Sequence, residues 1–412
     1  MSEKLFDNDI INHLAKETGL IKRVRKVHAR HLLDMLLFDS GSSFQQQAIQ
    51  LAAKYDLQIS KQALHQRHTG ELLEFVKSVF DKLLLTNVDE KEIKGMEVKI
   101  KDSTRFALPA VLATKYPGGN VGNQKTGASV QFEFGIKSGK SAIKLTPASK
   151  NDQGESRLDK ETIEPGILYL RDLGYSHQSY MANVMAKGAY FINKLIPSTL
   201  IYIKDKNGNY VSLNLSSLPS EGVFDQTVYL SKKKFPVRLL IHRVNESLRK
   251  NRIENIEKNN RWRGAKTSNT YKERAAFNFV VTNLPTEKYP AELIQKLYHL
   301  RWQIELVFKA WKSTLKLDDI PSKGAYTVEC ILYGKLIWAL LNWKVSMSLG
   351  SIGEVSIAKV HQVIENSKEM LRQALYFMSE KWFRFLEKIP LAAIELESKK
   401  GRLKTKDLIV SI

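Results

Sequence analysis

Residues 1–90 show the apolar spacing of short helices and contain almost no strand-like run. Phe44–Tyr55 carries apolar residues at helical spacing, a polar break follows at residues 56–58, and Ser60 can cap a second helix over Lys61–Arg67. This order predicts a helix-turn-helix, although any short helical hairpin would show the same pattern. Four side chains of the second helix are of types that can reach base edges or phosphates: Gln62, His65, Gln66 and Arg67.

Beyond residue 94 the pattern changes to short strands that alternate with helices. Glu97–Asp102 alternates apolar and polar positions, Ile167–Asp172 is an apolar run, and each predicted strand ends in an aspartate. The other predicted elements are a hairpin, a helix and a further strand: Ala128–Ile136 with Ala142–Leu145, Ser176–Ala186, and Ala189–Lys194. Together they predict an α/β fold, a mixed sheet with helices on its faces.

Residues 197–282 are rich in strand-like runs and predict a β-rich insertion into this core. The runs are a hairpin within Ile201–Leu215 and strands at Thr227–Leu230, Val237–Arg243 and Phe277–Thr282. The stretch Arg249–Arg274 is instead polar and densely basic, with Trp262 between Arg261 and Arg263. A run of charge is usually a solvated surface, but an aromatic ring flanked by cations suits contact with DNA, and we favour that interpretation.

The C-terminal part is again helical. Ile331–Val345 is shorter than a membrane span and contains Lys335, so it is predicted to be a buried helix. Ile357–Leu375 has an amphipathic pattern and is the segment that we expect to join two copies of the chain. The predicted domains are a helical DNA-binding domain (1–90), a first part of the catalytic core (91–196), the insertion (197–282), a second part of the core (283–328) and a helical C-terminal domain (329–412).

Leu297–Lys312 has the period of a single helix. In that helix four polar residues would share one stripe: Tyr298, Arg301, Glu305 and Lys312. Ion pairs on a solvated helix surface would explain any one of these pairs. A carboxylate beside cations also fits a metal ligand flanked by groups that hold phosphates, and the two upstream strand-end aspartates favour this second interpretation. Asp102, Asp172 and Glu305 could converge on a pair of hard cations, which prefer oxygen ligands, although each aspartate alone is more often a cap or turn residue.

Composition supports a polyanionic partner. The 412 residues carry a net charge of +21 and a pI near 9.7, which favours nucleic acid. The lone Cys330 gives no internal disulfide and suits a reducing cytoplasm, and the N-terminus has no signal-peptide pattern. A structural zinc site is not expected at His28 and His31 or at His65 and His68, because no cysteine lies near them.

The polar stripe and the aspartates together resemble a known family. The pattern Tyr298-x2-Arg301-x3-Glu305-x6-Lys312, with Asp172-x-Gly174-Tyr175 and Asp102-Ser103-Thr104 upstream, is similar to that of the insertion-sequence transposases with a Tyr–Arg–Glu–Lys signature, insertion-sequence family four. These are DDE transposases with a ribonuclease-H-like core of the retroviral-integrase superfamily. The resemblance implies that Asp102, Asp172 and Glu305 hold two Mg²⁺ ions, which Mn²⁺ can replace, while Tyr298, Arg301 and Lys312 contact phosphates of the transposon end.

The resemblance also implies a bacterial, nucleoid-associated enzyme that acts in the cytoplasm, without a membrane partner, as a homodimer on paired DNA ends. It would bind double-stranded DNA at terminal inverted repeats, cleave it, and join it to target DNA. Family members that form a hairpin on the DNA end carry a tryptophan where this chain has Asn278, and Phe277 or Trp262 could replace it as a stacking surface. Two alternatives remain: a nuclease of the same fold that does not join strands, and a transposase-derived DNA-binding protein without catalysis.

Overall fold

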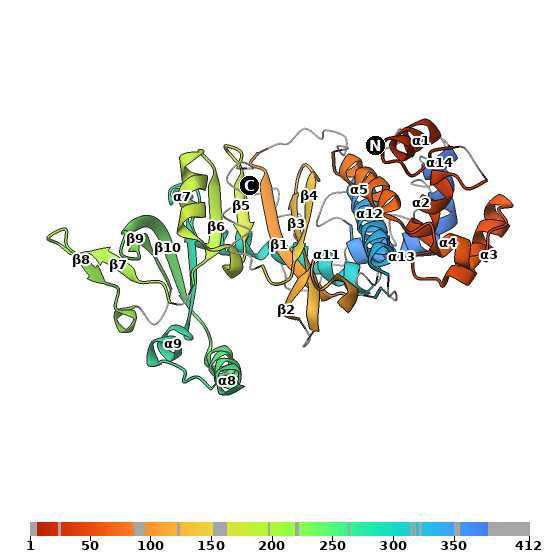
Figure 1. The fold of residues 1–412 in the computed structure, drawn as a ribbon. Helices are drawn as coiled ribbons and strands as arrows, with labels where there is room; N and C mark the ends of the chain where they lie inside the picture. The colour runs from red at the N-terminus through yellow and green to blue at the C-terminus, as the bar shows by residue number, and fades with distance from the viewer. Residues whose placement is uncertain are drawn as a thin grey trace. The chain divides into compact units, whose positions relative to one another are not determined.

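The structure is a computed structural model that describes residues 6–23, 26–85, 95–121, 124–150, 163–196, 198–218, 222–262, 264–313, 316, 319–320, 324–349 and 355–377 (Figure 1). The chain forms two compact units, each assembled from separate stretches of sequence. Unit 1 comprises Met1–Gly95, Asp102–Lys150 and Trp302–Ile412, and unit 2 comprises Met96–Lys101 and Asn151–Arg301.

Unit 1 begins with a set of helices: α1 (Asn8–Glu17), α2 (Ala29–Phe38), α3 (Phe44–Tyr55), α4 (Lys61–His65) and α5 (Gly70–Leu85). A capping box between Ser43 and Gln46 starts α3, and Asp56 ends it in the left-handed conformation at φ 51°. The Ser60 side chain accepts a hydrogen bond from the backbone N–H of Ala63 and so caps α4. The two predicted helices and the break between them are confirmed.

The core of unit 1 forms around α12 (Ala325–Leu349), which packs against α2 and α5. Nearly every side chain from Thr327 to Met347 is buried, so the predicted buried helix is confirmed. The helix backbone comes close to α2 at Gly334, where a Cβ atom would lie 2.8 Å from the carbonyl oxygen of Leu36. The helices α13 (Ile357–Asn366) and α14 (Lys368–Phe377) follow and cover the segment with the amphipathic pattern.

Unit 1 also contains the strands β2 (Pro117–Val121), β3 (Gln124–Gly135) and β4 (Ser141–Pro147), with β3 paired to both others in antiparallel register. The helix α11 (Trp302–Ser313) buries Phe308 and Trp311 on one face. The Trp311 ring centroid lies 4.8 Å from that of Phe132 on β3, and the Phe132 centroid lies 5.3 Å from that of Trp343 on α12. Aromatic contacts therefore join α11 to the strands and to the central helix.

Unit 2 is organised on a mixed sheet. Its strand order begins with residues 98–101 of β1 (Val98–Ala107), then β5 (Leu168–Arg171), β6 (Tyr190–Lys194), β11 (Phe277–Thr282), β10 (Phe235–Arg243), β9 (Val223–Leu230), β7 (Ile201–Lys204) and β8 (Tyr210–Ser212). β1, β5 and β6 are parallel, and the later pairs are antiparallel. The helix α7 (Gln178–Ala186) packs Tyr180, Met181 and Val184 into the apolar cluster of this sheet. The mixed α/β architecture and the predicted insertion strands are confirmed.

Two predictions about element bounds are wrong. β1 continues past Asp102 to Ala107, so Asp102 lies inside a strand rather than at its end, because Thr104 and Phe106 continue the buried alternation. The single helix expected over Leu297–Lys312 is two helices, α10 (Ala291–His299) and α11, with Leu300 and Arg301 between them. The backbone N–H groups of Leu300 and Arg301 donate to the carbonyls of Leu297 and Tyr298, the tight pattern of a helix end.

The basic stretch of the insertion is also helical. α8 (Glu246–Trp262) has no buried residue, and α9 (Asn269–Arg274) follows it. Arg252 of α8 donates hydrogen bonds to the carbonyl oxygens of Ala275 and Phe277, which anchors α8 to the start of β11. None of the helices in the described part of the chain combines the length and apolar character that crossing a membrane requires.

Candidate active site

Asp172 directly follows β5 in unit 2. Its side chain does not cap the short 3₁₀ turn Leu173–Tyr175 that comes next, so the capping role that a lone aspartate usually has does not apply here. The Tyr298 hydroxyl lies 3.3 Å from Asp172 Oδ1 and 3.4 Å from the carbonyl oxygen of Arg171. Arg301 Nε lies 3.9 Å from the same carboxylate oxygen. α10 and the residue pair after it thus bring two signature residues to the end of β5.

The side chains that contact Asp172 are already in place in the structure. The Arg301 side chain is only 10% exposed, whereas that of Asp172 is 38% exposed. Burial raises the pKa of Tyr298 above its usual range, and the negative charge of Asp172 raises it further. Tyr298 therefore stays a neutral hydrogen-bond donor. The carboxylate faces a donor and a cation while keeping an accessible surface.

Beneath this carboxylate lies a buried arginine that the sequence did not single out. Arg171 is fully buried, and its guanidinium carbon lies 4.2 Å from the ring centroid of Tyr180 and 5.8 Å from that of Tyr175. The contacts fix the last residue of β5, the one before Asp172, against tyrosines of α7 and the following turn.

Unit 1 holds the other three signature residues. Asp102 lies in β1, where its Oδ1 accepts a hydrogen bond from the backbone N–H of Ser103 at 2.8 Å. Glu305 is half-buried in the first turn of α11. Lys312, in the last turn, is exposed, and its Nζ donates to the carbonyl oxygen of Arg105 on β1 at 3.2 Å. α11 and β1 therefore present two carboxylates and a cation within one unit.

The six residues thus fall into two groups of three, one in each unit. Among the described residues no three His, Cys, Asp or Glu side chains form a ready-made metal cluster. The donors themselves suit a hard divalent cation, since all three acids are carboxylates that keep some exposure.

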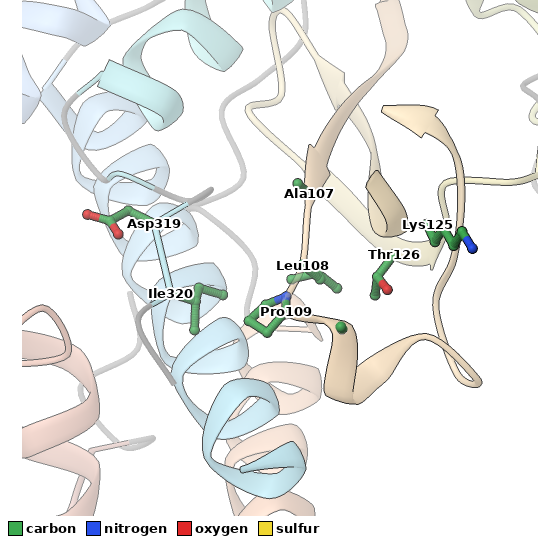
Figure 2. Close-up of a pocket in the computed structure, with 8 residues that line it drawn as sticks. Ala107, Leu108, Pro109, Lys125, Thr126, Asp319 and Ile320 are labelled. Carbon is green, nitrogen blue, oxygen red and sulfur yellow. The ribbon is translucent and has the colours of Figure 1, made fainter. Parts of the chain in front are cut away.

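A cavity of about 600 Å³ in unit 1 lies apart from these residues (Figure 2). Leu108 and Pro109 after β1, Thr126 of β3, and Asp319 with Ile320 line it. Its lining contains none of the signature residues, and its two charged groups, Lys125 and Asp319, have opposite sign. We do not assign the chemistry to this cavity.

The predicted DNA-contact residues are exposed to different degrees. Gln62 and Gln66 are exposed on α4 and at its end, and Arg67 is half-buried. Gln66 and Arg67 line a second cavity of about 620 Å³ together with Lys22 and Arg23. The basic side chains of the α1–α2 loop thus join those at the end of α4, a juxtaposition that the sequence did not reveal.

On the insertion, Trp262 is 86% exposed at the end of α8, and Arg261 beside it is exposed, while Arg263 lies outside the described residues. Phe277 is only 7% exposed and lies under the Arg243 guanidinium at 4.8 Å, so it is not available as a stacking surface and that suggestion is wrong. Asn278 accepts a hydrogen bond from Arg252.

Comparison with known proteins identifies the class. The family model described as transposase DDE domain matches residues 93–341, and the chain belongs to this family. It is a DNA-cleaving and strand-transferring enzyme, and membership implies dependence on divalent metal ions.

The chain is more particularly similar to transposases of insertion sequences, and its function is that of an insertion-sequence transposase. It is 30% identical to the transposase for insertion sequence element IS1151 of Clostridium perfringens, over 84% of this chain and 80% of that protein. It is 29% identical to the transposase for IS231F of Bacillus thuringiensis subsp. israelensis, over 80% of this chain and 75% of that one. A piggyBac transposase synaptic complex with hairpin DNA matches in structure with a TM-score of 0.43, at 11% identity, over 97% of this chain and 86% of that one.

Proposed function

We propose that this transposase works by a cut-and-paste reaction in which Asp102, Asp172 and Glu305 together hold two Mg²⁺ ions in a ribonuclease-H-like core. The observation that carries this proposal is the parallel register of β1 and β5. Lys101 lies opposite Arg171, and the next residue along the chain after each is an aspartate, Asp102 and Asp172. Parallel neighbours end their shared ladder at the same edge, which favours a common role for the two acids.

Divalent cations at such a site supply an activated water or 3′-hydroxyl and neutralise charge on the phosphate. The protein side chains would hold the metal ions and orient the ligands. Asp172 is already oriented by Tyr298 and Arg301, so little reorganisation is needed when it becomes a ligand. Mn²⁺, which has a similar preference for oxygen, should substitute for Mg²⁺.

Arg301, Lys312 and Tyr298 would hold phosphates of the transposon end. Arg301 offers a planar fork that can bind two phosphate oxygens, and Lys312 offers a point charge on a mobile stem. Their present contacts support this: Arg301 lies at a carboxylate that is 38% exposed, and exposed Lys312 donates only to a backbone carbonyl among its described contacts.

The DNA would be recognised by regions outside the signature. We propose that Gln62, Gln66 and Arg67 at α4 contact the terminal inverted repeats, and that Arg261, Trp262 and Arg263 contact DNA from the insertion. The exposure of the two glutamines and of Trp262 supports these roles. Target DNA would be the second substrate, in the bacterial cytoplasm at the nucleoid.

Joining two ends in one reaction requires two active sites, so we propose a homodimer on paired ends, with Ile357–Leu375 of the helical C-terminal domain as its contact region. The domain division by residue number given above stands as part of the same proposal. Formation of a hairpin on the DNA end would need a stacking surface other than Asn278, and exposed Trp262 is the candidate on the insertion.

The test is a cleavage and strand-transfer assay on duplexes that carry the element's own terminal repeats. We expect nicked and then joined products with Mg²⁺ or Mn²⁺, and none with a chelator. Cleaved DNA without joined product would favour the nuclease alternative, and binding without cleavage would favour the catalytically silent one. Mixing differently tagged copies on paired ends, followed by sizing, checks the dimer: activity of a lone copy on two ends would contradict it.

A further inference from the structure

The outer strands of the insertion carry a lysine–tyrosine face that the signature and the basic helix α8 do not account for. We define this face as Tyr202, Lys204, Tyr210, Tyr229 and the turn Ser231–Lys234. We propose that it is a second DNA-contact surface, one that binds the phosphate backbone of duplex DNA without regard to sequence. The inference rests on the proposed function, because it assumes that DNA is the partner.

Strand register places these residues on one side of the sheet. Tyr202 lies opposite Tyr229, and Lys204 lies opposite Tyr210. Tyr202 and Lys204 are two residues apart on β7, so all four side chains point to the same face. The alternate positions Val228 and Leu230 are fully buried in the apolar cluster of unit 2. One face therefore builds the core, and the other presents rings and cations.

The rings and lysines contact one another. The Tyr210 and Tyr229 ring centroids lie 4.8 Å apart in an edge-to-face arrangement, and Lys204 Nζ lies within 5.5 Å of both centroids. Lys234 Nζ lies over the Tyr202 ring and 5.0 Å from the Tyr210 centroid. Such packing orients the lysine stems while leaving their charge available to a phosphate. Tyr210 is 43% exposed, so the face is open in unit 2 as described.

The turn between β9 and β10 is built to present lysines. Lys232 and Lys233 are exposed at its tip, and Ser231 and Lys234 both adopt the left-handed conformation, with φ of 58° and 53°. Glycine or asparagine would take up that conformation more easily, yet lysine occupies the second position. Gln178 of α7 donates to the Ser231 hydroxyl at 2.5 Å and ties the turn to the rest of unit 2.

The acids of this region do not neutralise it. Both Asp225 oxygens are bound by Arg238, through Nε at 2.7 Å and Nη2 at 2.6 Å. Asp205 accepts the backbone N–H groups of Asn207 and Asn209 in the β7–β8 turn and keeps its negative charge, so one carboxylate stands against four lysines, Lys204, Lys232, Lys233 and Lys234. The unpaired strand edge of β8 also stands at the end of this sheet, as Figure 1 shows. A strand from another chain could pair there, but the positive charge of the adjacent face fits a phosphate backbone better.

The experiment compares the triple variant Lys204→Ala/Lys233→Ala/Lys234→Ala with a control that loses the same charge elsewhere, Lys16→Ala/Lys187→Ala/Lys288→Ala. The three control lysines are exposed, as are Lys204 and Lys233, while Lys234 is half-buried. Binding to a terminal-repeat duplex and to an unrelated duplex is measured across a salt series. Each phosphate contact contributes about 0.9 to the slope of log affinity against log salt, so the patch variant should flatten the slope by roughly 2–3. The control should change it by less than about 1.

Two further readouts complete the test. The ratio of affinities for the two duplexes should stay unchanged in the patch variant, because backbone contacts do not read sequence. The thermal midpoint should stay close to that of the wild type, since the replaced side chains are exposed or half-buried. An unchanged salt slope, or a change only in oligomeric state, would overturn the DNA proposal. Absence of salt-dependent DNA binding by the wild type would instead contradict the proposed function itself.

Discussion

Asp172 and Lys312 lie in different units of the chain, and their surroundings differ. Asp172 faces the half-buried Tyr298 of α10 and the nearly buried Arg301 that follows this helix, both more than a hundred residues further along the chain. In unit 1, the signature residue Lys312 is exposed, and its Nζ donates a hydrogen bond to a backbone carbonyl oxygen of β1. Asp172 therefore has side-chain partners in its own unit, whereas the described contact of Lys312 is to the backbone.

The largest effect should come from the acids themselves. Asp102→Asn, Asp172→Asn and Glu305→Gln each keep size and polarity but remove a negative ligand, so each should reduce cleavage by about 10³-fold or more. Binding of the terminal-repeat duplex without metal, measured in parallel, should be largely retained. Normal cleavage by any one of these variants would show that the substituted acid is not needed for the reaction, and would contradict the comparison between the two units.

Substitution of Arg301 should affect both cleavage and stability, whereas substitution of Lys312 should affect mainly cleavage. Arg301→Ala should reduce cleavage and lower stability by about 1–3 kcal/mol, because it leaves a buried space beside Asp172. Lys312→Ala should reduce cleavage but change stability by less than about 0.5 kcal/mol, because the side chain is exposed. The measurements are single-turnover cleavage and thermal unfolding of the same preparations.

Arg301→Lys serves as the matched control for charge. One ammonium group cannot reproduce the planar fork, so this variant should stay impaired in cleavage. If it is fully active, Arg301 acts only as a positive charge. If Arg301→Ala loses activity only in proportion to its loss of folded protein, the arginine is structural.

Tyr298→Phe should have a smaller effect. It removes one hydroxyl and keeps the ring, and such a hydrogen bond is worth about 0.5–1.5 kcal/mol, so cleavage should fall by roughly tenfold or less. Tyr298→Leu, which loses the ring as well, separates the packing of the ring from the hydrogen bond. Equal cleavage by wild type and Tyr298→Phe would mean that the hydroxyl does not orient Asp172.

The smallest expected effect concerns pH. Because the folded-state pKa of Tyr298 is raised, the tyrosine contributes stability below the unfolded pKa of about 10, and this contribution is lost as pH rises through the folded-state pKa. The ratio of cleavage rates for wild type and Tyr298→Phe should therefore be constant between about pH 6 and 9. A ratio that changes within that window would mean that Tyr298 ionises there, and that its burial beside Asp172 is not maintained in the active complex.

The sequence predicted those elements in which apolar residues recur with a regular spacing or form a long apolar run. α3 and the buried core of α12 follow from their apolar spacing and apolar content. α8 could not be found in this way, because it buries no residue and so leaves no apolar stripe in the sequence.

The candidate site was predicted in its residues but not in its geometry. The break at Leu300 and Arg301 contains no glycine or proline, so no residue at this point of the sequence indicates that one helix ends and another begins. The polar Asp102 looked like a strand end although the buried alternation runs on to Phe106. The contact between Tyr298 and Asp172 joins residues that are 126 positions apart. The surroundings of Arg171 are likewise formed only in the folded chain, where tyrosines pack around its guanidinium group.

The segmented make-up of unit 1 has a consequence for how the protein is synthesised. The helices α2 and α5 leave the ribosome early, but the helix they pack against, α12, begins only at Ala325. The sheet strands of unit 2, by contrast, are complete once Thr282 has been made, so this unit can close while the chain is still growing. A nascent or truncated chain without α12 leaves apolar helix faces uncovered and open to chaperones and proteases. Completion of translation thereby becomes a condition for a stable unit 1.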